Sequence, residues 1–181
     1  MNNSMNSSID RVPQDSAEVG SHATPSFHGI DHIALAVHNL DDAIHLFQDV
    51  LGFRLRRRFH IKGKKSGMVA ADMVRDGICF VLCQGTEPES QVSQLVQNFG
   101  AGLAHVALAV DDVSTAIDTL KERGLSFDTT VIEGAGLTQA FSSRCPNTGM
   151  TIELIHRSGK EGFLESNVQE LFDQLESSGK Y

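Results

Sequence analysis

A nine-residue phrase occurs twice in this chain, and each copy carries a histidine at its fourth position. The first copy is GIDHIALAV at residues 29–37, and the second is GLAHVALAV at residues 102–110. The two histidines, His32 and His105, are 73 residues apart (105 minus 32), and the similarity continues at this offset in the segments that follow. Such a repeat indicates two copies of one supersecondary unit that share a core.

Each copy predicts the order strand, helix, strand, strand, strand. In the repeated phrase, histidine and alanine alternate with Ile, Leu and Val, which is typical of a strand with one small-residue face. Polar residues suited to cap a helix then precede apolar stripes of helical spacing, at Asn39–Asp42 and at Asp111–Asp112. The predicted strands are residues 30–37, 53–61, 67–74 and 77–83 in the first copy, and 103–110, 125–132, 137–143 and 149–156 in the second.

The expected fold class is therefore α+β. Two βαβββ modules, residues 28–100 and 101–158, are expected to pair into one curved sheet, or half-barrel, around a metal site, with a short linking helix at residues 88–99. The Ser- and Asn-rich residues 1–27 have no apolar run and predict a disordered tail. Apolar residues at helical spacing between 163 and 177 predict an amphipathic helix, within a segment 159–181 that covers the pocket.

Composition argues against a nucleic-acid-binding protein and against a membrane-spanning one. The net charge of −8 argues against nucleic acid as a partner, and no apolar run approaches the roughly 20 residues of a membrane span. The three cysteines, Cys79, Cys83 and Cys145, form an odd set without a C-x-x-C pair, which favours a reducing compartment. We therefore expect a cytoplasmic protein, and exposed module edges make a homodimer plausible.

A third metal ligand is expected near the two histidines. Glu153 lies in the otherwise apolar segment TIELI, where a carboxylate is costly unless it is paired or bound to a cation. Any one of the three residues could be an ordinary core or strand-end side chain, but their coincidence in the two modules favours a metal site. Two histidines and one carboxylate suit Fe(II), although Zn, Mn, Ni or Co could occupy the same atoms. At the offset of 73 residues, the position in the first module that is equivalent to Glu153 is Phe80. Because phenylalanine cannot bind a metal, three ligands are expected in total.

These residues resemble the vicinal oxygen chelate superfamily, which includes glyoxalase I, methylmalonyl-CoA epimerase and extradiol dioxygenases, over roughly residues 29–157. More specifically, the chain is similar to the catalytic half of 4-hydroxyphenylpyruvate dioxygenases. The strings that carry this resemblance are FHIKG at 59–63, GLAHVA at 102–107, LTQAF at 137–141, IELIHR at 152–157 and GFLESN at 162–167.

The resemblance implies a role for several residues. It implies metal binding by His32, His105 and Glu153, and a non-haem Fe(II) dioxygenase that acts on O2 and a 2-oxo acid similar to 4-hydroxyphenylpyruvate. It implies catalytic roles for Gln139 and for Phe163, which would close the pocket. The residues expected to contact the substrate are Gln91, Gln139, Phe80, Phe141 and Phe163. Strand alternation puts Gln139 and Phe141 on one face, although Gln139 could equally be an ordinary strand amide.

The sequence also departs from this family. The family's N-terminal half is not present here, Ala70 stands where a serine is expected, and an expected asparagine falls at Cys83 or Gln84. Two alternatives stay open: a metal-dependent isomerase or lyase of the glyoxalase or epimerase type, and a small-molecule-binding resistance protein. Against the first, the extra ligand would fall on Phe80 and an epimerase's catalytic carboxylate near Ala70. Against the second, the three-ligand set is complete.

One basic concentration interrupts this acidic chain. Residues 54–65 hold seven of its fifteen lysines and arginines. Such a run is typical of a solvated strand edge that is protected by charge from aggregation. It could also attract an anionic substrate or partner. The remaining histidines are not expected to act directly; they are His22, His28, His38, His45, His60 and His156.

Overall fold

The computed structural model describes residues 24–63, 66–134, 136–159, 169–170 and 173–174. The first module contains β1 (Gly29–Ala36), α1 (Leu40–His45), the π-helical turn η1 (Leu46–Val50), β2 (Arg54–Lys62), β3 (Gly67–Arg75) and β4 (Ile78–Gly85). After α2 (Gln91–Phe99), the second contains β5 (Gly102–Ala109), α3 (Val113–Glu122), β6 (Ile132–Gly134), β7 (Leu137–Phe141) and β8 (Thr151–Arg157).

Within the described residues, the strands form one eight-stranded sheet in the order β2-β3-β4-β1-β5-β8-β7-β6. The pairs β1–β4 and β5–β8 are parallel, and β1 runs antiparallel to β5 at the seam between the modules. Ile33 pairs across this seam with Val106, its own counterpart in the repeat. The sequence repeat therefore corresponds to a pseudo-two-fold axis that passes through the β1–β5 seam.

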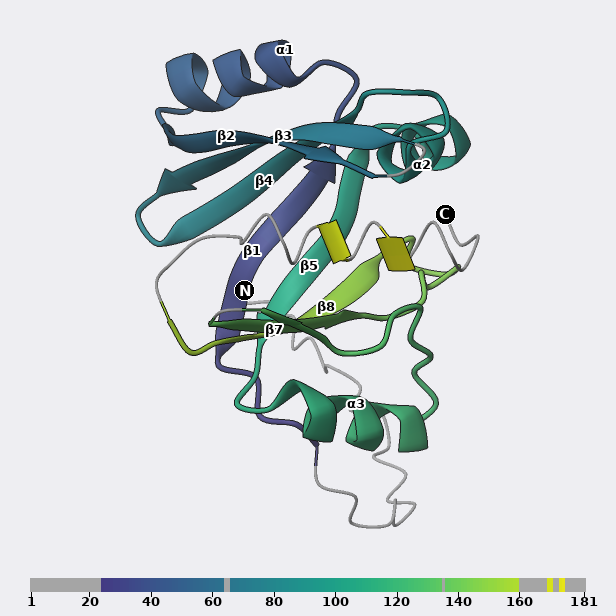
Figure 1. Cartoon of the computed structure of the whole chain (residues 1–181). Helices are drawn as coiled ribbons and strands as arrows, with labels where there is room; N and C mark the ends of the chain where they lie inside the picture. The colour runs from purple at the N-terminus through teal and green to yellow at the C-terminus, as the bar shows by residue number, and fades with distance from the viewer. Residues whose placement is uncertain (1–23, 64–65, 135, 160–168, 171–172, 175–181) are drawn as a thin grey trace, which may run out of the picture.

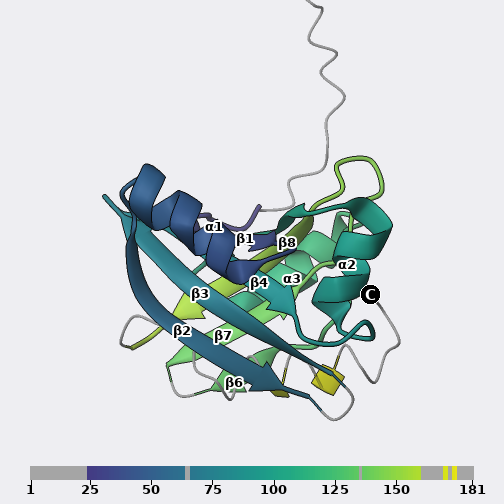
Figure 2. The same ribbon diagram turned by 90° about the horizontal axis from the view of Figure 1, so that it is seen from above.

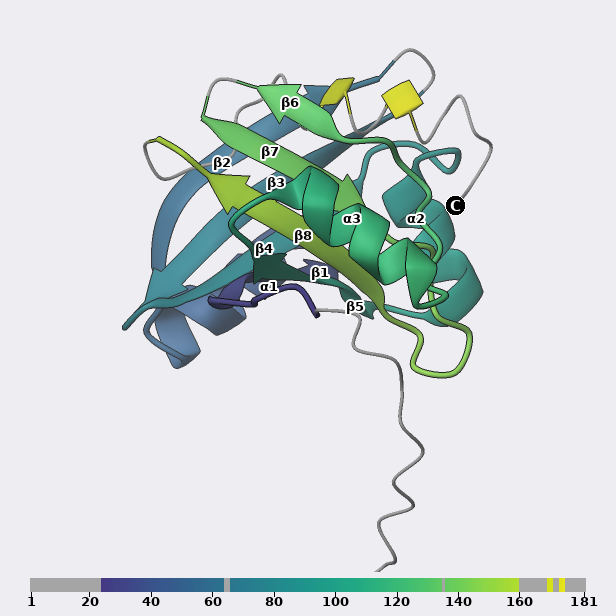
Figure 3. The same ribbon diagram turned by 90° about the horizontal axis from the view of Figure 1, so that it is seen from below.

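The helices α1 and α3 lie on the outer side of the curled sheet, above β2–β4 and below β7–β8 respectively (Figure 1). The view from above shows α1 across the strands of the first module (Figure 2), and the view from below shows α3 across β7 and β8 (Figure 3). Leu40 and Phe47 pack against Met73 and Leu82 in the first module, and an apolar stripe on α3 packs against Leu154 in the second. The inner side of the sheet is thereby left for a site.

The cap residues follow the sequence prediction. The backbone N–H of Asp42 donates to the Asn39 side chain at 3.0 Å, and that of Thr115 donates to Asp112 at 2.6 Å. Each bond satisfies an N–H group that has no partner within the helix. The half-barrel of two paired modules, with its α+β class, is confirmed.

One predicted strand is wrong. Residues 125–132 form only an isolated bridge between Phe127 and Ser142, and β6 begins at Ile132. Two backbone bonds flank this bridge, from Asp128 N to Phe141 O at 2.9 Å and from Ser143 N to Ser126 O at 2.8 Å. Side chains supply further bonds: Thr129 Oγ1 accepts from Phe141 N at 2.9 Å, and Ser143 Oγ donates to Asp128 Oδ1 at 2.6 Å. Ser, Thr and Asp residues often compete in this way with regular pairing.

The two ends of the chain are described only in part. Residues 1–23, most of the predicted N-terminal tail, lie outside the described residues, as does Phe163. Residues 169–170 and 173–174 are helical, and Gln174 accepts hydrogen bonds from Thr130 N and Oγ1, both at 3.2 Å. In the described ranges, no helix has the length and apolar character needed to span a membrane.

Candidate metal centre

The site begins with two irregularities at the β1–β5 seam. Asp31 is an extra residue on β1, between the pairs Ile30–Leu108 and His32–Ala107, and Ala104 is its counterpart on β5. A bulge of this kind re-aims a side chain, because the extra residue breaks the strand's alternation. Asp31 consequently lies beside the His32 imidazole, with its Oδ1 2.8 Å from Nδ1.

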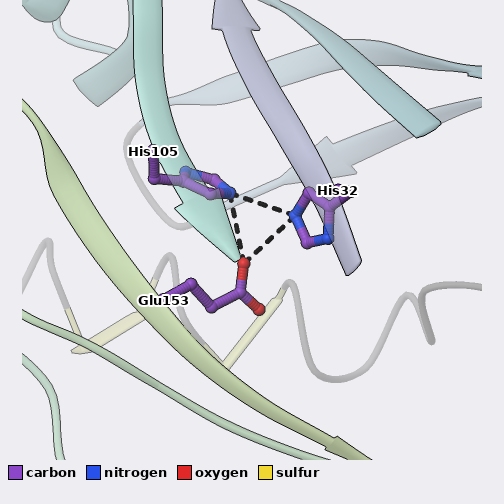
Figure 4. A group of neighbouring side chains, drawn as sticks. All are labelled: His32, His105 and Glu153. Atoms are coloured by element: carbon purple, nitrogen blue, oxygen red, sulfur yellow. Dashed lines mark hydrogen bonds and ion pairs between the residues drawn. The ribbon is translucent and has the colours of Figure 1, made fainter. Parts of the chain in front are cut away.

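His32, His105 and Glu153 converge from β1, β5 and β8 (Figure 4). Glu153 Oε2 lies 3.1 Å from His32 Nε2 and 3.2 Å from His105 Nε2, and the two Nε2 atoms are 3.2 Å apart. The three residues form a group of the kind that can hold a metal ion. Ligand atoms about 2.1 Å from a common ion and at right angles to one another stand about 3.0 Å apart, which is close to these separations.

The burial of Glu153 gives a test of whether a cation fits here. Its side chain is fully buried, and its Oε1 has no hydrogen-bond partner among the described residues. A buried carboxylate oxygen without a donor is costly, and a bound cation removes that cost. The donor set therefore fits a divalent metal.

A second layer holds His32 in place. Arg157 donates to both oxygens of Asp31, from Nε to Oδ2 at 2.6 Å and from Nη2 to Oδ1 at 2.9 Å. Because Asp31 in turn contacts His32 Nδ1, it directs Nε2 toward the group, as carboxylates commonly do for metal-binding histidines. Sequence reasoning missed Asp31 and Arg157, and the adjacent Asp–His pair was the only signal for them.

By themselves, the side chains of His32 and Glu153 form a buried ion pair. Burial opposes the charged form of His32, but the carboxylates of Glu153 and Asp31 outweigh it and raise the pKa of His32 to about 9. Burial likewise opposes ionisation of Glu153, yet the two imidazoles lower its pKa to about 2. Burial lowers the pKa of His105. A metal would therefore displace a proton from His32, because only a neutral imidazole coordinates.

Two of the predicted substrate residues lie on the face of the triad. The ring of Phe141 stands 5.2 Å from the His105 ring, edge to face, and Phe141 pairs with Glu153 across β7 and β8. Gln139 is buried two residues before Phe141 on the same face of β7. Gln91 is the half-buried first residue of α2, whose Val92 packs against Ala34 and its neighbours.

Phe80 does not lie where the repeat offset predicts. Its ring packs 4.9 Å from Phe47 and 5.7 Å from Phe53, in the cluster beneath α1, on the outer face of the sheet. Ala34 pairs with Val81, whereas its symmetry counterpart Ala107 pairs with Glu153, so the first module has one extra residue and Val81 is the true equivalent of Glu153. The structure therefore places Phe80 on the face opposite the triad, against the predicted position, and puts Val81, whose side chain cannot coordinate a metal, at the position equivalent to Glu153.

The family model of the Glyoxalase/Bleomycin resistance protein/Dioxygenase superfamily matches residues 29–142. Among curated proteins, hemolysin VllY of Vibrio vulnificus is 25% identical over 92% of this chain and 57% of its own length. A 4-hydroxyphenylpyruvate dioxygenase of Legionella pneumophila is 24% identical over 81% of this chain and 53% of its own. The chain thus spans about half the length of these relatives.

Solved structures agree on the fold. A mutant of 4-hydroxymandelate synthase from Streptomyces coelicolor superposes with a TM-score of 0.74 and 21% identity, over 83% of this chain and 54% of that one. A methylmalonyl-CoA epimerase from the same organism superposes with a TM-score of 0.62 and 22% identity, over 74% of this chain and all of that one. At such identities the likeness concerns the fold alone. With the family model covering more than half of its length, the chain belongs to the Glyoxalase/Bleomycin resistance protein/Dioxygenase superfamily.

Proposed function

We propose that this protein is a metal-dependent enzyme in which His32, His105 and Glu153 hold a divalent metal, best Fe(II). We further propose that it oxygenates a 2-oxo acid similar to 4-hydroxyphenylpyruvate with O2. The observation that carries the proposal is the convergence of three ligand atoms, all within 3.2 Å of one another, on a buried carboxylate that has a free oxygen. Two histidines and one carboxylate leave open coordination positions, which is the arrangement of non-haem iron oxygenases.

Each residue of the site has a distinct task in this proposal. Iron bound there would supply redox chemistry with O2 and Lewis acidity toward the oxo acid. Asp31 holds His32 in the orientation that directs Nε2 toward the group, and Phe141 packs edge to face against the His105 ring. Gln139, on the same face of β7 as Phe141, is proposed to contact a substrate oxygen. Phe163, outside the described residues, is proposed to close the pocket.

The competing activity is a non-redox isomerase or lyase reaction. An epimerase with this fold is matched by the present chain over its whole length. This activity is disfavoured by two positions. Val81 stands where a fourth ligand would arise, and Ala70, buried in the same inner-face cluster, cannot accept a proton. A three-ligand site with apolar neighbours fits oxygenation better.

Oxygen consumption tests the proposal. Metal-free protein would be loaded anaerobically with Fe(II) and then mixed with O2 and 4-hydroxyphenylpyruvate, phenylpyruvate or a branched-chain oxo acid. We expect oxygen uptake matched by CO2 release, lost in Glu153→Ala and retained in Glu133→Ala, which removes an exposed carboxylate from β6. Tight Fe(II) binding without uptake on any of these acids would refute oxygenation and favour the non-redox alternative.

A further inference from the structure

An open-sided cavity of about 460 Å³ lies where the β3–β4 turn meets the start of β1 and the end of β8. None of the three metal-ligand candidates lines it. Asp31 and Arg157 line it together, so the pair that supports His32 separates the cavity from the triad. Nothing in the proposed oxygenation uses this space.

The cavity is basic in an otherwise acidic chain. Four arginines line it, Arg54, Arg56, Arg75 and Arg157, against two aspartates, Asp31 and Asp76. The lining therefore carries two positive charges in excess. Asp72 and Arg57, which pair with each other beside Arg56, leave this excess unchanged.

A bulge in β2 builds the basic wall. Arg56 is the extra residue between the pairs Leu55–Met73 and Arg57–Asp72, so two consecutive arginines reach the same side of the strand. Both contact the fully buried carboxylate of Asp72, Arg56 at 3.2 Å and Arg57 at 3.0 Å. Their side chains are only 25% and 30% exposed.

Arg58 on the same strand behaves differently. Its side chain is half-exposed and pairs with the exposed Asp41, as expected for a solvated strand edge. Within the described part of the chain, Arg54 forms no ion pair although it lines the cavity. Arg54 is also exposed, but it lines the cavity together with the partly buried Arg56, whereas Arg58 does not. Strand-edge protection accounts for Arg58, while Arg54 and Arg56 place their charges on the wall of an open-sided cavity.

We propose that this cavity is an anion-binding site for a small organic dianion, recognised through phosphate or carboxylate oxygens. The planar, multiply donating guanidinium matches both groups, and a recess with an excess of positive charge concentrates an anionic ligand. The volume lies within the range of about 300–1,000 Å³ typical of small-molecule sites. The proposal does not depend on the proposed oxygenase activity.

Isothermal titration calorimetry on the metal-loaded protein tests this, with phenyl phosphate and glutarate as probes. We expect saturable binding of at least one, weakened about tenfold or more by Arg54→Glu, since a charge-assisted contact is replaced by repulsion. Arg58→Glu is the matched control, because it makes the same charge change on the same strand outside the cavity, and it should alter affinity less than about twofold. The tighter probe identifies phosphate or carboxylate as the recognised group.

Three results would overturn the proposal. The first is that neither probe binds at millimolar concentration. The second is that both variants weaken binding equally, which would indicate an effect of the general surface charge only. The third is that binding survives in Arg54→Glu and disappears in Glu153→Ala, which would place the anion on the metal. Thermal melting checks that Arg54→Glu is folded, and Arg54→Gln, which removes the charge without reversing it, should show a smaller loss in the same direction.

Discussion

Asp31 links the two sites of this molecule, since it contacts His32 on one side and Arg157 on the other. Replacing it by asparagine keeps the shape but removes the charge that orients and polarises the imidazole. We expect Asp31→Asn to weaken metal binding by about 10- to 100-fold. Competition with a chromogenic chelator measures the affinity, and Asp41→Asn, at an exposed carboxylate, is the control. Equal affinities in the two variants would contradict the positioning role.

The three free thiols differ in acidity. Burial raises the pKa of Cys79 to about 11 and that of Cys83 to about 12. Hydrogen bonds from the Thr148 hydroxyl, and from neighbouring backbone N–H groups, lower the pKa of Cys145. Because the thiolate is the reactive form, and its fraction falls tenfold for each pH unit below the pKa, Cys145 should react with iodoacetamide about a hundredfold or more faster than Cys79 at pH 8.

Peptide mass spectrometry of timed samples measures these thiol reactivities. The rate at Cys79 should rise about tenfold per pH unit between pH 8 and pH 10, while Cys145 approaches a plateau earlier. In denaturant the three rates should converge, which serves as the control. Native Cys79 reacting as fast as Cys145 at pH 8 would show that burial does not suppress its ionisation.

At the scale of elements, the corrected position of Phe80 on β4 gives a prediction that separates packing from function. Phe80→Ala removes the ring that packs on Phe47 and Phe53, and we expect it to lower the free energy of unfolding by about 3 kcal/mol. Metal affinity should stay within twofold of the original. Phe141→Ala is the matched comparison, because its ring supports His105 and its loss should weaken both stability and metal binding.

Urea unfolding and a chelator competition, carried out on both variants, decide this. If Phe80→Ala folds with normal stability but binds metal weakly, Phe80 contributes to the metal site and the packing role is refuted. The one-residue difference between the modules explains why the repeat misplaced it: a shift of one residue along a strand transfers each side chain to the other face.

At the scale of the whole molecule, the proposed metal ligands span the seam. His32 belongs to the first module, whereas His105 and Glu153 belong to the second, so an ion bound by the three would hold the two halves together. At a hundred times its dissociation constant such a ligand stabilises the folded state by about 2.7 kcal/mol. For a chain of this size we expect the melting temperature to fall by roughly 5–10 °C when the metal is removed.

Differential scanning fluorimetry with and without a chelator measures this shift. Restoring the metal should restore the melting temperature, and Glu133→Ala should respond like the original protein. In Glu153→Ala the chelator should have no effect. A chelator-induced shift that persists in Glu153→Ala would mean that the stabilising ion binds elsewhere.

The sequence by itself determined the architecture and the triad. Repeated phrases encode repeated units, and strand alternation places His32 and His105 at matching points of two modules. Glu153 could be found because a carboxylate in an apolar strand is costly unless it is matched. These inferences depend on local pattern and on the sequence offset, both of which are visible without coordinates.

Only the tertiary structure decided the rest, because it depends on register. The bulge at Asp31, the shift from Phe80 to Val81 and the bulge at Arg56 are irregularities of single residues, and each reverses which side chains share a face. The basic cavity likewise joins β1, the β3–β4 turn and the end of β8, which are distant in sequence. Hydrophobic periodicity specifies which face of a strand is buried, but side-chain packing across strands selects the register, and that information is not local.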